Sequence, residues 1–380
     1  MRKGWEYKKL GEVCCPKSKI QRATKCFGGS DEILYIDISS IDNSVQEVNS
    51  ITSFTMSNAP SRAQQKVEYG DIIVSTVRPN LKNVAFIKQH DSNLVVSSGF
   101  CVLRTTDDIE RNYLFRYITS DIFTQHLMKL TTGANYPAVR DLDVRDSTIP
   151  LPPKSTQIAI VTELDKINEL IRLKKEQLKD FDNLAQSLFY EMFGDPVENE
   201  KGWEVKKLIE VSSLINGRAY KQNELLSEGK YKVLRVGNFF TNSNFYYSNL
   251  ELEDEKYCYK GDLLFAWSAS FGAFIWDEDK TIFHYHIWRV LFDKAILDIH
   301  YYQYLLNTMT SFFMNDVHGI GMVHLTKSGM EQYELPLPPL SLQRLFAQRI
   351  EQIEREKSEV QKSIQDLETL LASRMQYWFE

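Results

Sequence analysis

The 380-residue sequence lacks the features that mark membrane proteins, secreted proteins and disulfide-rich proteins. No apolar run approaches the roughly 20 residues that a membrane-spanning helix needs, and the first residues lead into no signal-peptide core. The five cysteines include no Cys-x-x-Cys pair of the kind that binds metal ions, so we expect reduced thiols. These absences favour a cytoplasmic location.

Motifs of catalysis are also missing. There is no Gly-x-x-x-x-Gly-Lys-Ser/Thr phosphate loop, no Gly-x-Gly-x-x-Gly dinucleotide motif and no Asn/Asp-Pro-Pro-Tyr/Phe motif of an amino-methyltransferase. His284 and His286 alternate on what we expect to be one face of a strand, with no adjacent cysteine or carboxylate, which argues against a metal site. We therefore expect no catalytic residue, metal or cofactor on this chain.

An excess of positive charge is missing as well, since 45 Lys and Arg stand against 51 Asp and Glu and the net charge is −6. Residues 1–153 carry 19 Lys and Arg against 17 Asp and Glu, whereas residues 195–339 carry 14 against 20. A field of this sign does not attract nucleic acid. Any DNA binding must therefore depend on local basic loops rather than on the charge of the whole molecule.

The sequence does contain an internal repeat. The opening Gly4-Trp5-Glu6-Tyr7-Lys8-Lys9-Leu10 returns as Gly202-Trp203-Glu204-Val205-Lys206-Lys207-Leu208. The run Ile149-Pro150-Leu151-Pro152-Pro153 returns as Leu335-Pro336-Leu337-Pro338-Pro339. Between these markers the sequences of the two copies are almost unrelated, so one architecture is repeated with two different intervening sequences. Such an organisation suits a protein that presents two different recognition surfaces.

Each proline run opens a long helical stretch, at residues 154–194 and 340–380. Apolar residues there alternate in steps of four and three, and a shift of 186 residues superimposes the two patterns. We expect the stretches to pair as an antiparallel coiled coil within one chain. Arg374 is interpreted as a solvent-facing end position, whereas Lys174 and Lys357, in the middle of the seams, either set the register or contact a partner protein.

Residues 1–153 and 195–339 show the short β-rich runs, turn residues and helical stretches of mixed α+β globules. The predicted helical stretches are residues 113–130 and 301–315. The predicted fold class is α+β, with two globules separated by two long helices that form an antiparallel coiled coil, in a pseudo-two-fold circular repeat. The predicted domains are residues 1–153, 154–194, 195–339 and 340–380.

Three duplicated markers together resemble the specificity (S) subunit of type I restriction–modification enzymes. They are the Gly-Trp-Glu-x-Lys-Lys-Leu opener, the strands that begin at Gly70-Asp71 and Gly261-Asp262, and the Pro-Leu-Pro-Pro-x-x-x-Gln runs that end at Gln157 and Gln343. The resemblance covers the whole chain. It implies that each globule is a target recognition domain for one half of a bipartite, asymmetric sequence in double-stranded DNA. It also implies that the helices act as a spacer and as the docking surface for two methyltransferase (M) subunits.

The resemblance places the chemistry on other chains. S-adenosylmethionine, ATP and Mg are expected on the M subunits and on the restriction/motor (R) subunits of a phage-defence complex. Two alternatives remain at this point. The chain could be a coiled-coil scaffold protein with two protein-binding globules, or the recognition subunit of a related restriction or phage-exclusion system with different partners.

Loops with arginine, lysine, asparagine and aromatic residues supply the candidates for DNA contact. Arginine pairs bidentately with guanine, asparagine with adenine, and lysine contacts phosphate or guanine. A solvated loop with ordinary turn chemistry is the alternative interpretation in each case. The candidates are Arg78, Asn80, Lys82, Asn135, Tyr136 and Arg140 in the first globule, and Arg218, Tyr220, Lys221, Trp267, Ser268, His324 and Lys327 in the second.

Overall fold

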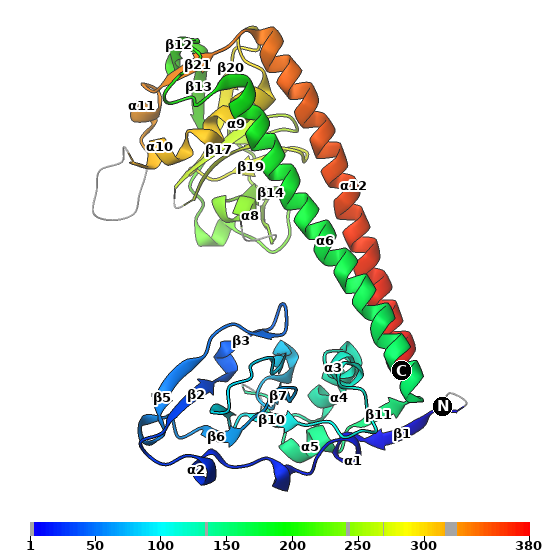
Figure 1. The fold of residues 1–380 in the computed structure, drawn as a ribbon. Helices are drawn as coiled ribbons and strands as arrows, with labels where there is room; N and C mark the ends of the chain where they lie inside the picture. The colour runs from blue at the N-terminus through cyan, green and yellow to red at the C-terminus, as the bar shows by residue number, and fades with distance from the viewer. Residues whose placement is uncertain (1–3, 134–135, 241–243, 269, 316–324) are drawn as a thin grey trace. The chain divides into compact units, whose positions relative to one another are not determined.

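The computed structural model describes residues 4–133, 136–240, 244–268, 270–315 and 325–380. They form two compact units. Figure 1 shows the fold, coloured from blue at the N-terminus to red at the C-terminus. Unit 1 comprises Met1–Lys174 and Ser363–Glu380, and unit 2 comprises Lys175–Lys362. Within the described ranges, no helix is both long enough and apolar enough to span a bilayer.

Unit 1 contains a mixed globule whose first and last strands are hydrogen-bonded neighbours. β1 pairs antiparallel with β11, and two further sheets have the strand orders β10-β7-β8 and β5-β2-β9-β6. The strands are β1 (Glu6–Lys9), β2 (Glu32–Ile36), β3 (Ile41–Asp42), β4 (Glu47–Val48), β5 (Thr52–Thr55), β6 (Ala63–Lys66), β7 (Ile72–Ser75), β8 (Val84–Phe86), β9 (Leu94–Ser97), β10 (Phe100–Leu103) and β11 (Thr148–Leu151). The helices of the globule are α1 (Leu10–Val13), α2 (Ala23–Cys26), α3 (Arg111–Ile118), α4 (Asp121–Leu130) and α5 (Asp141–Arg145).

Strand β7 shows how the globule of unit 1 is held together. Ile72 and Val74 belong to the core that α3, α4 and the long helices share, whereas Ile73 belongs to the core between the two sheets. Successive side chains of a strand point to opposite faces, so an apolar run without alternation is buried on both sides. β7 is therefore the central strand between two cores.

Unit 2 repeats this plan, with β12 paired antiparallel to β21 and sheets in the orders β13-β20-β17-β18 and β15-β14-β19-β16. Its strands are β12 (Glu204–Lys207), β13 (Ser212–Asn216), β14 (Tyr231–Leu234), β15 (Tyr246–Ser248), β16 (Tyr257–Cys258), β17 (Leu263–Ser268), β18 (Ser270–Ile275), β19 (Thr281–Phe283), β20 (Ile287–Phe292) and β21 (Glu334–Leu337). Its short helices are α7 (Leu208–Val211), α8 (Val236–Phe240), α9 (Ile299–Thr308), α10 (Thr310–Asn315) and α11 (Lys327–Met330).

The expected helical stretches at residues 113–130 and 301–315 are each divided into two helices, α3 and α4 in unit 1 and α9 and α10 in unit 2. The cause in unit 1 is Ser120, whose hydroxyl accepts a hydrogen bond from the Phe123 N–H and caps a new helix. Apolar periodicity alone did not reveal this break.

The Gln of each proline motif has a structural task. In unit 1, the Gln157 side chain donates a hydrogen bond to the Pro152 carbonyl at 2.9 Å and accepts one from the Glu110 N–H at 2.7 Å. The Tyr113 hydroxyl donates to the Pro150 carbonyl at 2.8 Å. These bonds satisfy carbonyls in a proline-rich strand and fix the start of α3 against the start of the long helix.

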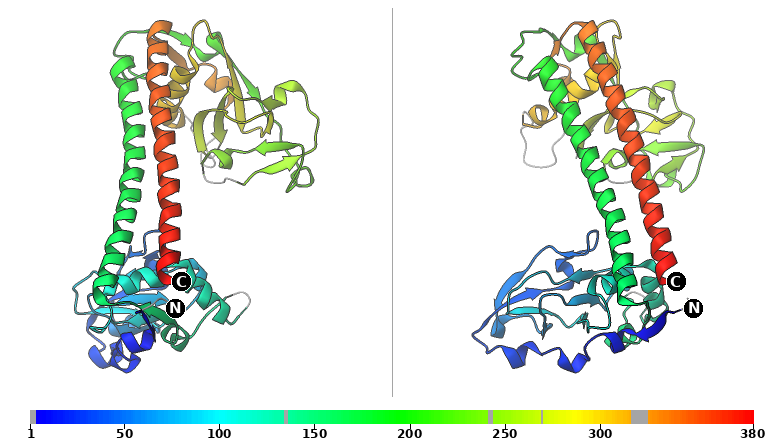
Figure 2. Two further views of the ribbon diagram at one scale, coloured as in Figure 1. Left: turned by 90° about the vertical axis from the view of Figure 1, so that its right-hand side faces the viewer. Right: turned by 45° about the vertical axis from the view of Figure 1, so that its right-hand side comes forward.

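The long helices are α6 (Lys154–Phe193) and α12 (Leu340–Phe379). In unit 2 their segments run antiparallel, because Phe189 packs on Phe346 while Asp182 pairs with Lys357. Figure 2 shows the two helices side by side from two further directions. The described seam residues are buried or half-buried, namely Ile160, Leu164, Ile167, Ile171, Lys174, Leu178, Phe181, Ala185 and Leu188, and Phe346, Ile350, Ile353, Lys357, Val360, Ile364, Leu367, Leu371 and Arg374. The predicted fold class is confirmed.

Arg374, interpreted as a solvent-facing end position, keeps 31% of its side chain exposed but is also paired with the facing helix. In unit 1 its guanidinium pairs with the Glu163 carboxylate, with Nη2 3.0 Å from Oε2, and the Trp378 indole donates to the same oxygen at 3.1 Å. Arg374 also lies 4.9 Å from the Trp378 ring centroid. A seam position near a helix end can therefore carry a charge because the facing helix supplies its partner.

Candidate nucleic-acid interface

The loop between β7 and β8 gives Arg78 an unusual backbone. Arg78 has φ +49° and precedes the short 3₁₀ turn Pro79–Leu81, and Lys82 after the turn has φ +50°. Residues other than glycine seldom adopt this left-handed conformation, and they do so where surrounding contacts impose it. Here the Arg78 N–H donates to the Pro137 carbonyl at 2.7 Å, which ties the loop to a second loop.

The structure brings two of the sequence candidates together. The Arg78 guanidinium carbon lies 4.6 Å from the centroid of the Tyr136 ring, and both residues are exposed. The bridges Val77↔Ala138 and Thr132↔Ala138 join their two loops. A cation stacked on an aromatic face keeps its in-plane N–H groups available to other acceptors. Arg78 and Tyr136 thus form one exposed surface of unit 1.

The other candidates of unit 1 are placed differently. Asn80 is exposed in the same 3₁₀ turn, and Lys82 pairs with Asp121 at 2.6 Å. Arg140 uses its guanidinium within the chain, because Nε and Nη2 both donate to the Asp143 carboxylate, at 3.1 and 2.6 Å. This pair lowers the pKa of Asp143, chiefly through the hydrogen bonds from Arg140. Asn135 lies outside the described residues.

In unit 2 the candidate Arg218 is also paired with a carboxylate. Both Nη atoms of Arg218 donate to Glu224, at 3.0 and 2.8 Å, and this bond lowers the pKa of Glu224 to about 2. Tyr220 is half-buried, with its hydroxyl 3.4 Å from the Phe283 carbonyl, and burial raises its pKa. Lys221 is exposed. A guanidinium fork held bidentately by a carboxylate must lose that pair before it binds a base.

Within the described residues of unit 2, β17, the counterpart of β7, is not followed by a loop like that of Arg78. Ser268 at the end of β17 is opposite Ser270 at the start of β18, and Ser268 is buried. Trp267 is half-buried, stacks on Trp288 at 5.2 Å and donates its indole N–H to the Tyr285 carbonyl at 3.1 Å. These two candidates therefore lie against the hydrophobic core and at the end of β17.

The remaining candidates of unit 2 are Lys327 and His324, and the pair His284 and His286 was expected on a strand. Lys327 begins α11 and lies 3.8 Å from Glu331, whereas His324 is outside the described residues. The expectation that His284 and His286 share a strand face was wrong, because they lie in the short connection between β19 and β20, where His284 forms an isolated bridge with Arg218 and His286 is in a turn. The His284 N–H donates to the Leu234 carbonyl at 2.9 Å, and burial lowers the pKa of its imidazole to about 4.

Arg235 was not among the residues predicted from the sequence. It directly follows β14, is exposed, and lies with its guanidinium carbon 5.4 Å from the Tyr246 ring centroid. The same signal that selected Arg78, a basic residue just after a strand, applies to Arg235. It borders a recess of about 290 Å³.

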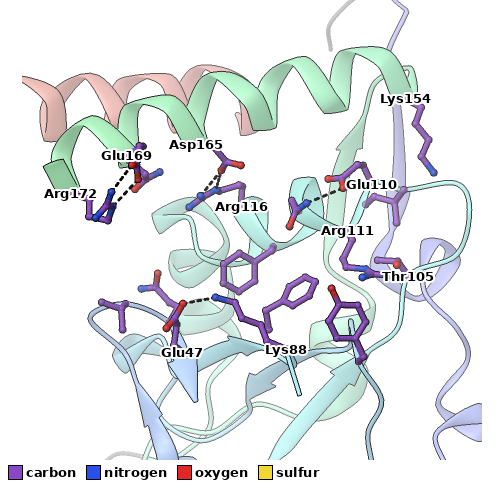
Figure 3. A pocket seen from close by; sticks show the side chains of 18 of the residues that line it. Glu47, Lys88, Thr105, Glu110, Arg111, Arg116, Lys154, Asp165, Glu169 and Arg172 are labelled. Atoms are coloured by element: carbon purple, nitrogen blue, oxygen red, sulfur yellow. Dashed lines mark hydrogen bonds and ion pairs between the residues drawn. The ribbon is translucent and has the colours of Figure 1, made fainter. Parts of the chain in front are cut away.

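A cleft of unit 1 with a volume of about 1340 Å³ lies between β8, α3 and α6 (Figure 3). Most of its charged side chains are paired with each other. Arg116 donates to Asp165 of α6 at 2.5 Å, and Arg172 donates to Glu169 at 2.6 Å. Arg111 lies near two aromatic rings instead, 5.7 Å from Tyr69 and 5.6 Å from Phe86. The Arg116–Asp165 pair fixes the globule of unit 1 to its long helix.

The described residues contain no group of three or more His, Cys, Asp or Glu side chains arranged to hold a metal ion. A model of the family described as the type I restriction modification DNA specificity domain matches residues 2–180 and 200–369, one match in each repeat. The chain belongs to this family.

Relatives with curated names agree with this assignment. The chain is 24% identical over 300 residues to the MjaIX specificity subunit of a type I restriction enzyme from Methanocaldococcus jannaschii, which covers 72% of this chain and 68% of the relative. It is 20% identical over 340 residues to the putative MjaX specificity subunit of the same organism, which covers 81% and 79%.

Solved structures agree with the fold. A chain from a structure on complex assembly and conformational transition of the type I R-M system matches with a TM-score of 0.70 and 27% identity, over 100% of this chain and 98% of that chain. The S subunit from M. genitalium matches with a TM-score of 0.52 and 14% identity, over 99% and 96%. This specificity subunit acts with other subunits on DNA, and the catalytic activities lie on those subunits. The scaffold-protein alternative is not favoured.

Proposed function

We propose that this specificity subunit reads an asymmetric, bipartite DNA sequence, with one half-site read by each unit. The observation that carries the proposal is the contrast between the repeats. The frame of each globule is the same, since β1–β11 corresponds to β12–β21 and Gln157 to Gln343. Among the described residues the loops on that frame differ, since β7 is followed by the left-handed Arg78 and a 3₁₀ turn, whereas β17 ends at Ser268, which is opposite Ser270 of β18.

In unit 1 we assign target contact to the surface formed by Arg78, Asn80 and Tyr136. The Arg78 guanidinium stacks on Tyr136 and is exposed, so its fork can meet the O6 and N7 acceptors of a guanine. Arg140 is a weaker candidate because Asp143 already occupies its fork. The strained backbone of Arg78 supports the assignment, since such strain is concentrated at functional sites.

The finer assembly is also part of the proposal. Two M subunits carry S-adenosylmethionine and transfer the methyl group to adenine, and R subunits use ATP and Mg. The repeat supports a ratio of two M subunits to one S subunit, because two copies of one frame offer two equivalent docking positions. Native mass spectrometry of the co-expressed S and M subunits measures this ratio directly, and a ratio of one to one would contradict it.

Methylation profiling of the co-expressed S and M subunits on a library of random DNA tests the proposal. The expected motif has two short, different half-sites with unread bases between them. Their centres should be separated by roughly one helical turn, about 10 base pairs. A continuous or palindromic motif would contradict the proposal, because two unlike surfaces cannot read two like half-sites.

A further inference from the structure

We propose that Arg235 is the arginine with which unit 2 reads a guanine of its half-site. The inference rests on the proposed function, and Arg235 is not among the candidates predicted from the sequence. It depends on three properties of Arg235, which are the availability of its guanidinium, the rigidity of its surroundings and the chemistry of the recess beside it.

The first property follows from a comparison within the unit. Residues 195–339 contain three arginines, which are Arg218, Arg235 and Arg289. Arg218 is held bidentately by Glu224. The Arg289 side chain is only 11% exposed and donates to the Tyr257 carbonyl at 2.8 Å. Arg235 is exposed and, within the part of the chain that the structure describes, forms no ion pair. It is the guanidinium of this globule that a base can reach.

The second property is a fixed backbone at the end of β14. The Arg235 N–H donates to Asn238 Oδ1 at 2.8 Å, and the Asn238 N–H donates back to the Arg235 carbonyl at 2.9 Å. Tyr246, on whose ring the guanidinium lies, belongs to the neighbouring strand β15 and pairs with Val233. A side chain that is already held in place loses less conformational entropy when it binds its target.

The third property is the composition of the recess. Arg235, Asn238, Tyr246, His284 and His286 are among its lining residues, and no lysine is. The Nδ1 atom of His284 accepts the His286 N–H at 3.4 Å, so neutral His284 carries its proton on Nε2 as a donor. The globule as a whole is acidic, with 14 Lys and Arg against 20 Asp and Glu.

This setting favours a base over a phosphate. Sites that follow the phosphate backbone gather several cations, whereas this recess offers one arginine fork in an acidic globule. The fork matches the two acceptors that guanine presents in the major groove. Arg78 on Tyr136 and Arg235 on Tyr246 are the same arrangement built on different loops, which is consistent with two half-sites that differ in sequence.

The test uses the complex of this full chain with its M subunits, profiled on random DNA, with the wild type, Arg235→Ala, Arg235→Lys and Lys294→Ala. Lys294 is an exposed cation of unit 2 that does not line the recess, so its loss controls for net charge. The half-site read by unit 2 is the one that Arg78→Ala leaves intact. The Arg235 variants should lose roughly 5- to 150-fold of the discrimination at one G·C pair of that half-site. Lys294→Ala should keep the wild-type profile.

Several results would overturn the inference. Uniform weakening at all positions would make Arg235 a phosphate contact, an unchanged profile would remove it from the interface, and full discrimination by Arg235→Lys would show that charge alone suffices. Thermal unfolding of each variant complex reports any folding defect separately, and Arg235→Lys preserves the charge if Arg235→Ala fails to assemble. A wild-type motif without two half-sites would instead reject the proposed function, independently of Arg235.

Discussion

Gln157 and Gln343 share two corresponding hydrogen bonds in the two repeats, and Gln343 donates a further one to the Ile296 carbonyl at 3.0 Å. Each amide accepts the N–H that begins the capping turn of a globule helix, from Glu110 or from Asp298, and donates to a proline carbonyl. Both side chains are almost fully buried, at 1% and 0% exposure. A buried amide with all its partners in place specifies one geometry, so the two residues set the junction between globule and long helix.

We expect Gln157→Ala and Gln343→Ala to destabilise the protein by about 1–3 kcal/mol each, because each leaves a buried N–H and a carbonyl without a partner. Thermal and urea unfolding measure the loss. Gln186→Ala, at an exposed position of α6, is the matched control and should change stability little. Equal stability of all three variants would show that the junction is held by packing alone.

Arg78→Ala should relax recognition of one half-site and leave the other unchanged, since the loss of a bidentate base contact costs about 1–3 kcal/mol of discrimination. Methylation profiling of the variant complex measures the effect. Arg78→Lys keeps the charge without the fork and should relax the same position. Equal relaxation in both half-sites, or in neither, would remove Arg78 from the recognition surface.

The Glu163–Arg374 pair predicts a pH dependence of stability. The hydrogen bond from Arg374 lowers the pKa of Glu163 below its ordinary value of 4.5. A depressed folded-state pKa stabilises the fold above the unfolded-state value, and this contribution is lost as the pH falls through the folded-state pKa. Both side chains are about one third exposed, so we expect only about 0.5–1 kcal/mol at pH 7.

A double-mutant cycle of Glu163→Gln and Arg374→Gln, followed by urea unfolding from pH 7 to pH 3, measures this coupling. The coupling should shrink toward the acid end and at high salt. A coupling that is constant over this pH range would mean that the carboxylate charge does not contribute. The Trp378 indole, which donates to the same oxygen, would then account for the contact.

Gly217→Ala should damage unit 2. A Cβ atom at this position would lie 2.2 Å from the Phe283 carbonyl oxygen and 2.5 Å from that of His284, so a backbone segment must move. We expect a loss of at least about 2 kcal/mol and weaker recognition of one half-site, because the displaced segment carries the turn with His284. Gly28→Ala is the control, since its nearest neighbour would lie at 3.5 Å. If Gly217→Ala unfolds with the same stability as the wild type, the close approach of the Phe283 and His284 carbonyls to Gly217 is contradicted.

The sequence predicted the fold well because the fold depends on periodic and repeated signals. The proline runs marked the start of α6 and α12, and the heptad pattern identified the buried seam positions. Those signals are local, or they are repeated with a constant offset. The break between α3 and α4 escaped because a single serine hydroxyl, at Ser120, decides it.

The candidate site was harder to predict because pairing between distant residues decides which cations remain available. Nothing in the sequence around Arg218 reveals that Glu224 holds its fork, or that Arg78 rests on Tyr136 from a loop almost 60 residues away. Arg235 was missed for the same reason, since it stands out only because the other two arginines of its globule, Arg218 and Arg289, bind groups within the chain. The DNA contacts of these residues stay predictions.

The pairing of β1 with β11, and of β12 with β21, has an evolutionary consequence. Because the first and last strands of each globule are paired, the polypeptide leaves the globule beside the point where it enters. The segment between these two strands therefore begins and ends at the same place. Mutation can lengthen, shorten or replace that segment while both of its ends keep their places beside the long helix. A lineage can therefore acquire a new target by replacing one interior segment, and inherit the rest of the subunit unchanged.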